Sequence, residues 1–290
     1  MRLGLISDLH WMLEPPAAAS AWHGGSGDLA AALERMQLAL EHFAEQEVDL
    51  IALTGDLSHH GEDEALVQTL QACAGAGVPV LAVSGNHDLA GDALRLDRAL
   101  ASAAVQNTAL PSLAGSTHEH IRVAGVQVGA TDGWFGASLR ELPDTTPWGA
   151  DPVLLISHYP LLSLASLLSD NGFPYPGDLL DRAELADRLQ RRYAPTVVVG
   201  GHVHARAAAT AGPVLQLTSG AMVEPPYECA VIELERPAQE VLRVRRTSVR
   251  LREPGSGREP IFSPEHEEWV FDGAHWLAIS PAASPMPAGR

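Results

Sequence analysis

Short runs of apolar residues recur along the chain, and most of them end in small or polar residues. Residues 2–7, 48–53 and 78–82 form three such runs, each of a length typical of a buried strand. Between them, apolar positions repeat with helical spacing over residues 28–46, where Asp28 is the expected N-cap, and over residues 62–74. This alternation predicts a βαβαβ unit with a parallel sheet and right-handed crossovers.

The pattern changes after the third run. A helix is expected over residues 92–103. After it, short strands with alternating apolar positions replace the alternation of strands and helices. Residues 161–177 form a candidate lid, and residues 179–193 form a further helix. Strands are expected over residues 118–123, 126–131, 153–156, 196–199, 214–218, 229–234 and 241–249. We expect the last three of these to pair as antiparallel strands that complete a second sheet.

A change in composition divides the chain near its C-terminal end. Residues 1–252 are the expected catalytic domain, and residues 253–290 are an extension rich in Pro and Gly. Within the extension, Asp272-Gly273 lies between two apolar segments, which predicts a β-hairpin near residues 269–277. The hairpin either covers a sheet edge or contacts a second copy of the chain in a homodimer, and edge cover is the simpler interpretation.

The net charge of the chain argues against one class of partner, long nucleic acid. The chain of 290 residues has 36 acidic and 19 basic residues, a formal net charge of −17, so a broad basic surface for long nucleic acid is not expected. The N-terminal apolar run is cut off by Asp8, and residues 161–168 are far too short to span a membrane. Cys73 and Cys229 have no metal-site spacing and are expected to be buried thiols. Together these features predict a cytoplasmic protein without a membrane partner.

The strand ends carry residues of the types that bind metal ions. A single cluster such as Asn86-His87-Asp88 would be explained more simply as a turn. Five clusters in one α/β frame favour a shared site, because parallel strands present their carboxyl ends at one ligand-binding edge. Together the clusters supply two carboxylates, one amide and four imidazoles: Asp8, His10, Asp56, Asn86, His158, His202 and His204.

These candidate ligands are too many for one ion. Nitrogen and oxygen donors without thiolate suit two divalent ions of the Mn, Fe, Zn, Co or Ni type. A two-metal site needs a carboxylate that bridges the ions, and Asp56 of the middle cluster is the candidate. Two adjacent ions can activate a shared hydroxide as the nucleophile and clamp phosphoryl oxygens. They would also leave about +1 of local charge, enough to attract a phosphate ester into an acidic protein.

The motifs, taken in order, resemble those of the calcineurin-like metallophosphoesterases. They are Asp8-Leu9-His10, Gly55-Asp56, Gly85-Asn86-His87-Asp88, His158 and Gly201-His202-Val203-His204, and the resemblance covers roughly residues 1–250. It implies an α/β fold, a four-layer α-β-β-α sandwich of two mixed sheets with flanking helices. It also implies that Asp8, His10, Asp56 and His204 hold one ion and that Asp56, Asn86, His158 and His202 hold the other.

His87 and Asp88 are the expected catalytic residues beside the ions. His87 is not needed as a ligand and could stabilise the phosphoryl group or protonate the leaving oxygen. Asp88 either orients His87 or caps the following turn.

Residues 55–61 resemble the branch that contains the class III cyclic nucleotide phosphodiesterases. Only Arg206 and Arg140 offer extra cations near the motifs, which favours a small phosphodiester, including cyclic nucleotides, over a monoester. The alternatives are a phosphomonoesterase, a nuclease and a non-catalytic scaffold. Loop residues that could contact the substrate are His59, His60, Trp134, Tyr159 and Arg206.

Overall fold

The predicted βαβαβ unit forms the centre of the larger of two sheets. The computed structural model describes residues 1–14, 20–22, 25–89, 95–106, 112–114, 121–123, 126–130, 148–238, 241–252 and 258–279. Strands β1 (Arg2–Ile6), β4 (Leu50–Leu53) and β5 (Val80–Ala82) lie side by side and are parallel. Their carboxyl ends therefore meet at one edge of the sheet, as the sequence predicts.

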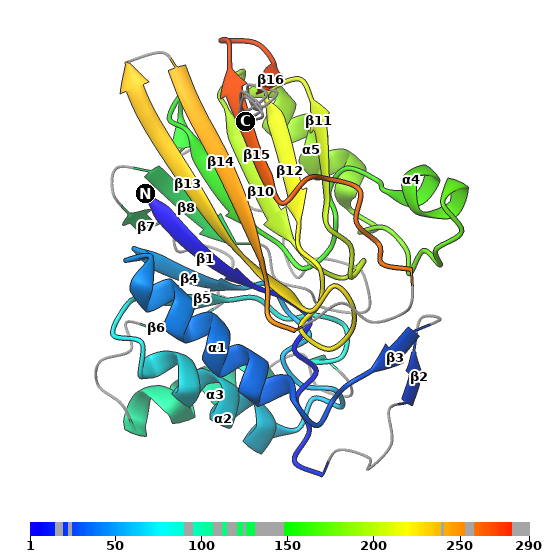
Figure 1. The fold of residues 1–290 in the computed structure, drawn as a ribbon. Coiled ribbons are helices and arrows are strands. Elements are labelled where there is room, and N and C mark those ends of the chain that lie inside the picture. The colour runs from blue at the N-terminus through cyan, green and yellow to red at the C-terminus, as the bar shows by residue number, and fades with distance from the viewer. Residues whose placement is uncertain are drawn as a thin grey trace, which may run out of the picture.

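The larger sheet has eight strands in the order β16-β15-β14-β13-β1-β4-β5-β6 (Figure 1). Antiparallel strands join the parallel centre on the side of β1, and β6 lies parallel to β5. The strands outside the centre are β6 (Ser112–Ala114), β13 (Glu228–Ala238), β14 (Val241–Arg250), β15 (His266–Phe271) and β16 (Trp276–Ile279).

A second sheet has the strand order β11-β12-β10-β9-β8-β7. Strands β8, β9, β10 and β12 are mutually parallel, and β7 and β11 are antiparallel edge strands. These strands are β7 (Ile121–Val123), β8 (Val126–Ala130), β9 (Val153–Ile156), β10 (Thr196–Gly200), β11 (Ala207–Ala211) and β12 (Val214–Thr218). A small separate ribbon pairs β2 (Ser20–Trp22) with β3 (Gly25–Gly27).

The strand pairing corrects one prediction. The sequence predicts that the last three strands before the extension lie in one antiparallel sheet, but they separate between the two sheets. Strand β12 pairs parallel with β10 in the smaller sheet, whereas β13 pairs antiparallel with β1 in the larger one. The separation follows from long-range partners: β13 satisfies the backbone groups on the otherwise open side of β1, and β14 then pairs with β13.

Helices cover the outer face of each sheet, so the predicted four-layer α/β architecture is confirmed (Figure 1). The helices are α1 (Ala32–Glu45), α2 (Asp63–Ala74), α3 (Arg95–Gln106), α4 (Ala165–Asp170) and α5 (Arg182–Arg191). Helix α1 begins four residues after its expected cap, although the Asp28 carboxylate accepts a hydrogen bond from the Ala31 N–H at 3.4 Å. The same carboxylate pairs with the guanidinium groups of Arg35 and Arg252. Among the described residues, no helix has the length and apolar character required to cross a membrane.

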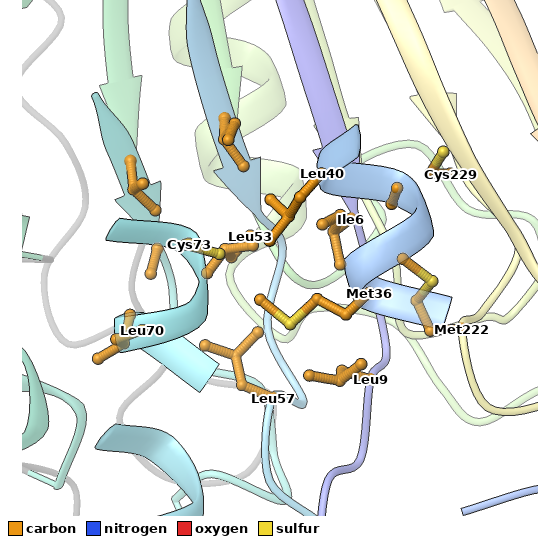
Figure 2. Packing of buried hydrophobic residues seen from close by; sticks show 14 of the residues in the cluster. Ile6, Leu9, Met36, Leu40, Leu53, Leu57, Leu70, Cys73, Met222 and Cys229 are labelled. Atoms are coloured by element: carbon orange, nitrogen blue, oxygen red, sulfur yellow. The ribbon is translucent and has the colours of Figure 1, made fainter. Parts of the chain in front are cut away.

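Three apolar layers hold the sandwich together: one between the larger sheet and its helices, one between the two sheets, and one between the second sheet and α5. Leu3 and Leu5 of β1 point toward the second sheet, where they pack with Leu154 and Ile156. The alternate side chain Ile6 points toward the helices and packs with Met36 of α1, as Figure 2 shows. Both cysteines are buried, as expected, and belong to the helix-side layer.

The C-terminal hairpin is part of the larger sheet. Strand β15 pairs with β14, and β16 then pairs with β15. The indole NH of Trp276 donates to the carbonyl of Pro213 in the loop before β12, at 2.8 Å. The hairpin therefore covers the edge of β14 and contacts the second sheet.

A close approach between β1 and α1 gives a test of this packing. A Cβ on Gly4 would lie 2.6 Å from Cδ2 of Phe43, far inside van der Waals contact. We expect Gly4→Ala to lower the free energy of unfolding by about 1–3 kcal/mol. Urea denaturation of Gly4→Ala, Phe43→Leu and the double variant should show that the two costs are less than additive. Full additivity, or a Gly4→Ala chain as stable as the parent, would contradict the contact.

Candidate metal centre

The candidate ligands of both sheets meet in two buried groups. Asp8, His10 and His204 form one group, and Asp56, His158 and His202 form the other; within each, the potential ligand atoms lie within 4.8 Å of one another. The two groups adjoin, because His10 Nε2 of the first lies 3.6 Å from Asp56 Oδ2 of the second. Asn86 completes the second group through its Oδ1, which is 3.2 Å from His158 Nε2. The structure therefore brings all seven candidate ligands together.

The backbone turns sharply at most of these ligands. Five of them have positive φ values between 48° and 67°: Asp8, His10, Asp56, His202 and His204. Non-glycine residues seldom adopt this left-handed conformation, which concentrates at functional sites. Here all five residues lie in loops that follow strands β1, β4 and β10. Backbone hydrogen bonds stabilise these turns, including His10 N–H to the Asp56 carbonyl at 2.8 Å.

Outer hydrogen bonds orient two of the histidines. The Nδ1–H of His158 donates to the Thr54 carbonyl at 2.7 Å, and Nε2 of the same ring faces Asp56 Oδ2 at 3.4 Å. Nδ1 of His204 lies 2.5 Å from Glu224 Oε1, and its Nε2 faces Asp8 Oδ1 at 3.3 Å. Histidines that bind metals commonly use one ring nitrogen for the ion and the other for such a partner.

Sequence reasoning missed Glu224. The residue is 6% exposed and lies in the loop after β12. The signal that could have found it is the one used for the other clusters, a polar side chain shortly after an apolar strand. The separation of Glu224 from the strand end by Ser219, Gly220 and three apolar residues hid that signal.

Burial and neighbouring charges control protonation in the site. Burial would raise the pKa of Asp8, but the charge and hydrogen bond of His204 outweigh it and lower the pKa to about 2. Burial would also raise the pKa of Asp56, but the charge and hydrogen bond of His158 outweigh it and lower that pKa. Burial followed by repulsion from His158 lowers the pKa of His202 to about 3. Although burial opposes it, Asp56 raises the pKa of His158 to about 9, and Asp8 likewise raises the pKa of His204 well above its ordinary value. A cation bound by these two rings would therefore displace their protons, whereas the carboxylates are already ionised and His202 is already neutral.

Three glycines of the motifs are required by close contacts. A Cβ on Gly85 would collide with the Asp56 carboxylate, and one on Gly201 would collide with Ser7 and the Asp8 carboxylate. Gly55 has φ +88°, and a Cβ there would lie 2.6 Å from His158 Nδ1. The glycines thus allow the backbone to approach the carboxylates that anchor each group.

His87 lies beside Asp56. Its backbone N–H donates to Asp56 Oδ1 at 2.8 Å, and its ring lies edge-on to His10 with centroids 4.6 Å apart. The ring Nδ1–H donates to the His59 carbonyl at 2.8 Å. His59 also stacks on His87 with centroids 5.1 Å apart and approaches His10 Nδ1 with its own Nδ1 at 3.4 Å. His59 therefore contacts a candidate ligand and the candidate acid, and the rings of His10, His59 and His87 form a third group of potential metal donors.

The structure gives Asp88 a role other than the two expected ones. Its carboxylate accepts hydrogen bonds from the backbone N–H groups of Leu57, Ser58 and Gly85, at 3.2, 2.8 and 3.0 Å. Asp88 thus ties the loop after β4 to the loop after β5, while the His59 carbonyl orients the His87 ring. Burial, followed by the nearby Asp56, raises the pKa of Asp88 to about 7. The sequence could not distinguish these partners, because they are backbone groups.

The other predicted substrate contacts have different outcomes. Arg206 is 4% exposed and its guanidinium is paired with Glu228, so its prediction as a substrate contact is wrong. Tyr159 is also buried, and its ring packs edge-on against His158 and His202. His60 is exposed next to His59, with ring centroids 4.4 Å apart. Trp134 lies outside the described residues, as does Arg140.

The donor set fits a pair of divalent ions. It consists of carboxylate and amide oxygens and imidazole nitrogens. These are buried together in two groups that adjoin where His10 faces Asp56. The outer partners Thr54 and Glu224 leave the Nε2 atoms of His158 and His204 directed at the carboxylates. Donors of these types serve several divalent transition metals, so they indicate the class of ion rather than one element.

Glu224 gives a test of this arrangement that does not depend on turnover. Glu224→Gln keeps the size of the side chain but removes the charge that faces His204 Nδ1. We expect about a 10–100-fold loss of affinity for the ion held near Asp8 and His204. Dialysis against buffered Mn²⁺ followed by elemental analysis measures this affinity. Glu265→Gln, with a side chain that is 63% exposed, is the matched control. Equal affinities in the two variants would show that Glu224 does not support the site.

Comparisons with known proteins agree with the fold and show the family of the chain. A search of the curated proteins finds no match. Among solved structures, the chain is similar to a dimetal phosphatase from Danio rerio, with a TM-score of 0.59, 14% identity, and coverage of 84% of this chain and 94% of that one. It is also similar to the protein TT1561 of Thermus thermophilus, with a TM-score of 0.54, 11% identity, and coverage of 87% and 99%. The sequence model of the calcineurin-like phosphoesterases matches residues 1–206, and the chain belongs to this family of dimetal phosphoesterases.

Proposed function

We propose that the chain is a dinuclear metal phosphodiesterase that hydrolyses small phosphate esters. In this proposal Asp56 would be a ligand of both ions. Asp8, His10 and His204 would hold the first ion with it, and Asn86, His158 and His202 would hold the second. The observation that carries the proposal is the pair of adjoining His and Asp groups with His87 attached to Asp56 through its backbone.

When bound, the two ions would supply an activated water and neutralise charge on the phosphoryl oxygens. The protein would supply the orientation of the ligands and the proton. Because Nδ1 of His87 donates to the His59 carbonyl, proton transfer to the leaving oxygen falls to Nε2. The stacked His59 ring and the edge of His10 hold the His87 ring in one orientation. Such fixed orientation is a large part of the advantage of a positioned acid.

Two observations favour a diester over a monoester. A monoester carries a second negative charge, which enzymes usually meet with an additional guanidinium. The guanidinium of Arg206 is already paired with Glu228 inside the protein. Glu224 adds a carboxylate next to His204. The similarity of residues 55–61 to the class III cyclic nucleotide phosphodiesterases makes cyclic nucleotides the first natural diesters to try.

Asp56→Ala tests the shared ligand. Loss of a carboxylate that faces both groups should remove at least one ion, so the metal content should fall from about two ions per chain to one or fewer. Elemental analysis after dialysis gives the content directly. Asp63→Ala, at a side chain 63% exposed on α2, is the control and should keep the parent's content. Undiminished metal in Asp56→Ala would overturn the bridging assignment.

His87→Ala tests the reaction itself. Protein stripped of metal and reloaded with Mn²⁺ should cleave bis-p-nitrophenyl phosphate faster than p-nitrophenyl phosphate. We expect His87→Ala to keep its metal and to lower kcat on the diester by about 10²–10⁴-fold. His266→Ala, with a side chain 70% exposed on β15, is the matched control.

The outcomes separate the alternatives. Cleavage of neither ester by metal-loaded protein would contradict the proposed activity, and a strong preference for p-nitrophenyl phosphate would make the chain a phosphomonoesterase. Unchanged kcat in His87→Ala would remove His87 from the reaction.

A further inference from the structure

A pocket opens beside His202 and His204, and most of its wall is apolar. The wall comes from four separate parts of the chain: the segment that begins with α4, the loop after β10, the loop after β12, and the extension. Its lining residues are Leu168, Phe173, Pro174, Pro176, His202, Val203, His204, Glu224 and Pro260. Glu224 is the carboxylate among these nine residues. Outside the lining, the guanidinium of Arg258 lies over the Phe173 ring, 5.0 Å from its centroid.

The segment with α4 is built into this wall by packing. Leu168 is buried against Val203 and Ala205, next to the candidate ligands. The backbone N–H of Phe173 donates to the Leu168 carbonyl at 3.0 Å, which closes the turn after the helix. The Phe173 ring then lies edge-on to Phe262 of the extension, with centroids 5.7 Å apart. The segment that the sequence suggests as a lid is thus a packed wall of the pocket in this structure.

The extension forms the opposite part of the wall through backbone pairing. Arg206 N–H donates to the Pro260 carbonyl at 3.0 Å, and Phe262 N–H donates to the Arg206 carbonyl at 2.8 Å. Arg206 follows the candidate ligand His204 by two residues, and its side chain is anchored by buried Glu228. Residues 258–262 are therefore held in a defined position against the site, although they lie beyond the part of the chain that matches the family.

The chemistry of the wall indicates what it can accept. An apolar surface next to a carboxylate favours an uncharged group and disfavours a second phosphate charge. The pocket lining does not include His10, His59 or His87, so the leaving group, which must face His87, would point elsewhere. The ester group that stays on the phosphate is the part of a diester that would reach the pocket.

We propose that this pocket binds the retained ester group of a phosphodiester and selects an uncharged aromatic or bulky apolar group. Residues 258–262 of the extension then take part in substrate selection. This inference rests on the proposed function, because it assumes a phosphate held at the metal centre.

The test compares two diesters with the same leaving group, phenyl p-nitrophenyl phosphate and methyl p-nitrophenyl phosphate. The parent, loaded with Mn²⁺, should favour the phenyl ester in kcat/KM by about tenfold or more, as expected for an apolar group in a fitted pocket. Phe173→Ala should reduce this ratio toward one, and Phe173→Leu should keep most of it. Pro176→Asp, at an exposed position of the same wall, should also lower the ratio without depending on the core. Leu277→Ala, 52% exposed on β16, should leave it unchanged.

A binding measurement separates the two proposals. Calorimetry with diphenyl phosphate and dimethyl phosphate should give the same preference for the aromatic group and the same loss in Phe173→Ala. Cleavage of neither ester, with a retained preference for diphenyl phosphate that Phe173→Ala removes, would overturn the proposed activity but support the pocket. A phenyl-to-methyl ratio near one in the parent, or an unchanged ratio in both Phe173→Ala and Pro176→Asp, would overturn the pocket assignment.

Discussion

Two buried carboxylates, Asp8 and Asp56, set the main constraint on this structure. A buried charge is costly unless it has charged or hydrogen-bonding partners. Here the partners come from both sheets: His204 and the backbone of His202 face Asp8, while His158 and the backbone of His87 face Asp56. The two sheets must therefore stay in a fixed relation, and the apolar layer between them provides it. Bound divalent ions would neutralise the same carboxylates, and the same histidines would serve as further ligands of the ions.

Hydrogen bonds and close contacts in the loops position the side chains of the site. Asp88 ties the loops after β4 and β5 together through three backbone hydrogen bonds, and Gly85 lets the backbone approach Asp56 closely. The His59 carbonyl holds Nδ1 of His87. None of these groups is a candidate metal ligand. Each one nevertheless determines the direction of a ligand or of the candidate acid. A substitution at Asp88 would thus disturb the site through loop position rather than through lost acid–base chemistry.

Backbone pairing joins the C-terminal part of the chain to both sheets. The hairpin β15–β16 continues the larger sheet, and residues 258–262 pair with Arg206 beside the second sheet. The buried pair of Arg206 and Glu228 explains why this arginine does not serve the substrate: breaking the pair would leave an uncompensated charge inside the protein. Substrate selection by the extension would give the pocket one wall that lies outside the segments of the candidate ligands, although His202 and His204 also line it.

The sequence by itself determined the parallel centre of the larger sheet and the set of candidate ligands. Apolar runs and the polar residues that follow them are local signals. Asp8, Asp56 and His158 each follow shortly after such a run. Tertiary structure alone decided that β13 pairs with β1, that Arg206 is buried against Glu228, that Glu224 contacts His204 and that Asp88 binds backbone groups. These partners lie far apart in the sequence or are backbone atoms, which no side-chain pattern identifies. Local periodicity reports which face of an element is apolar, but only the folded chain selects what that face meets.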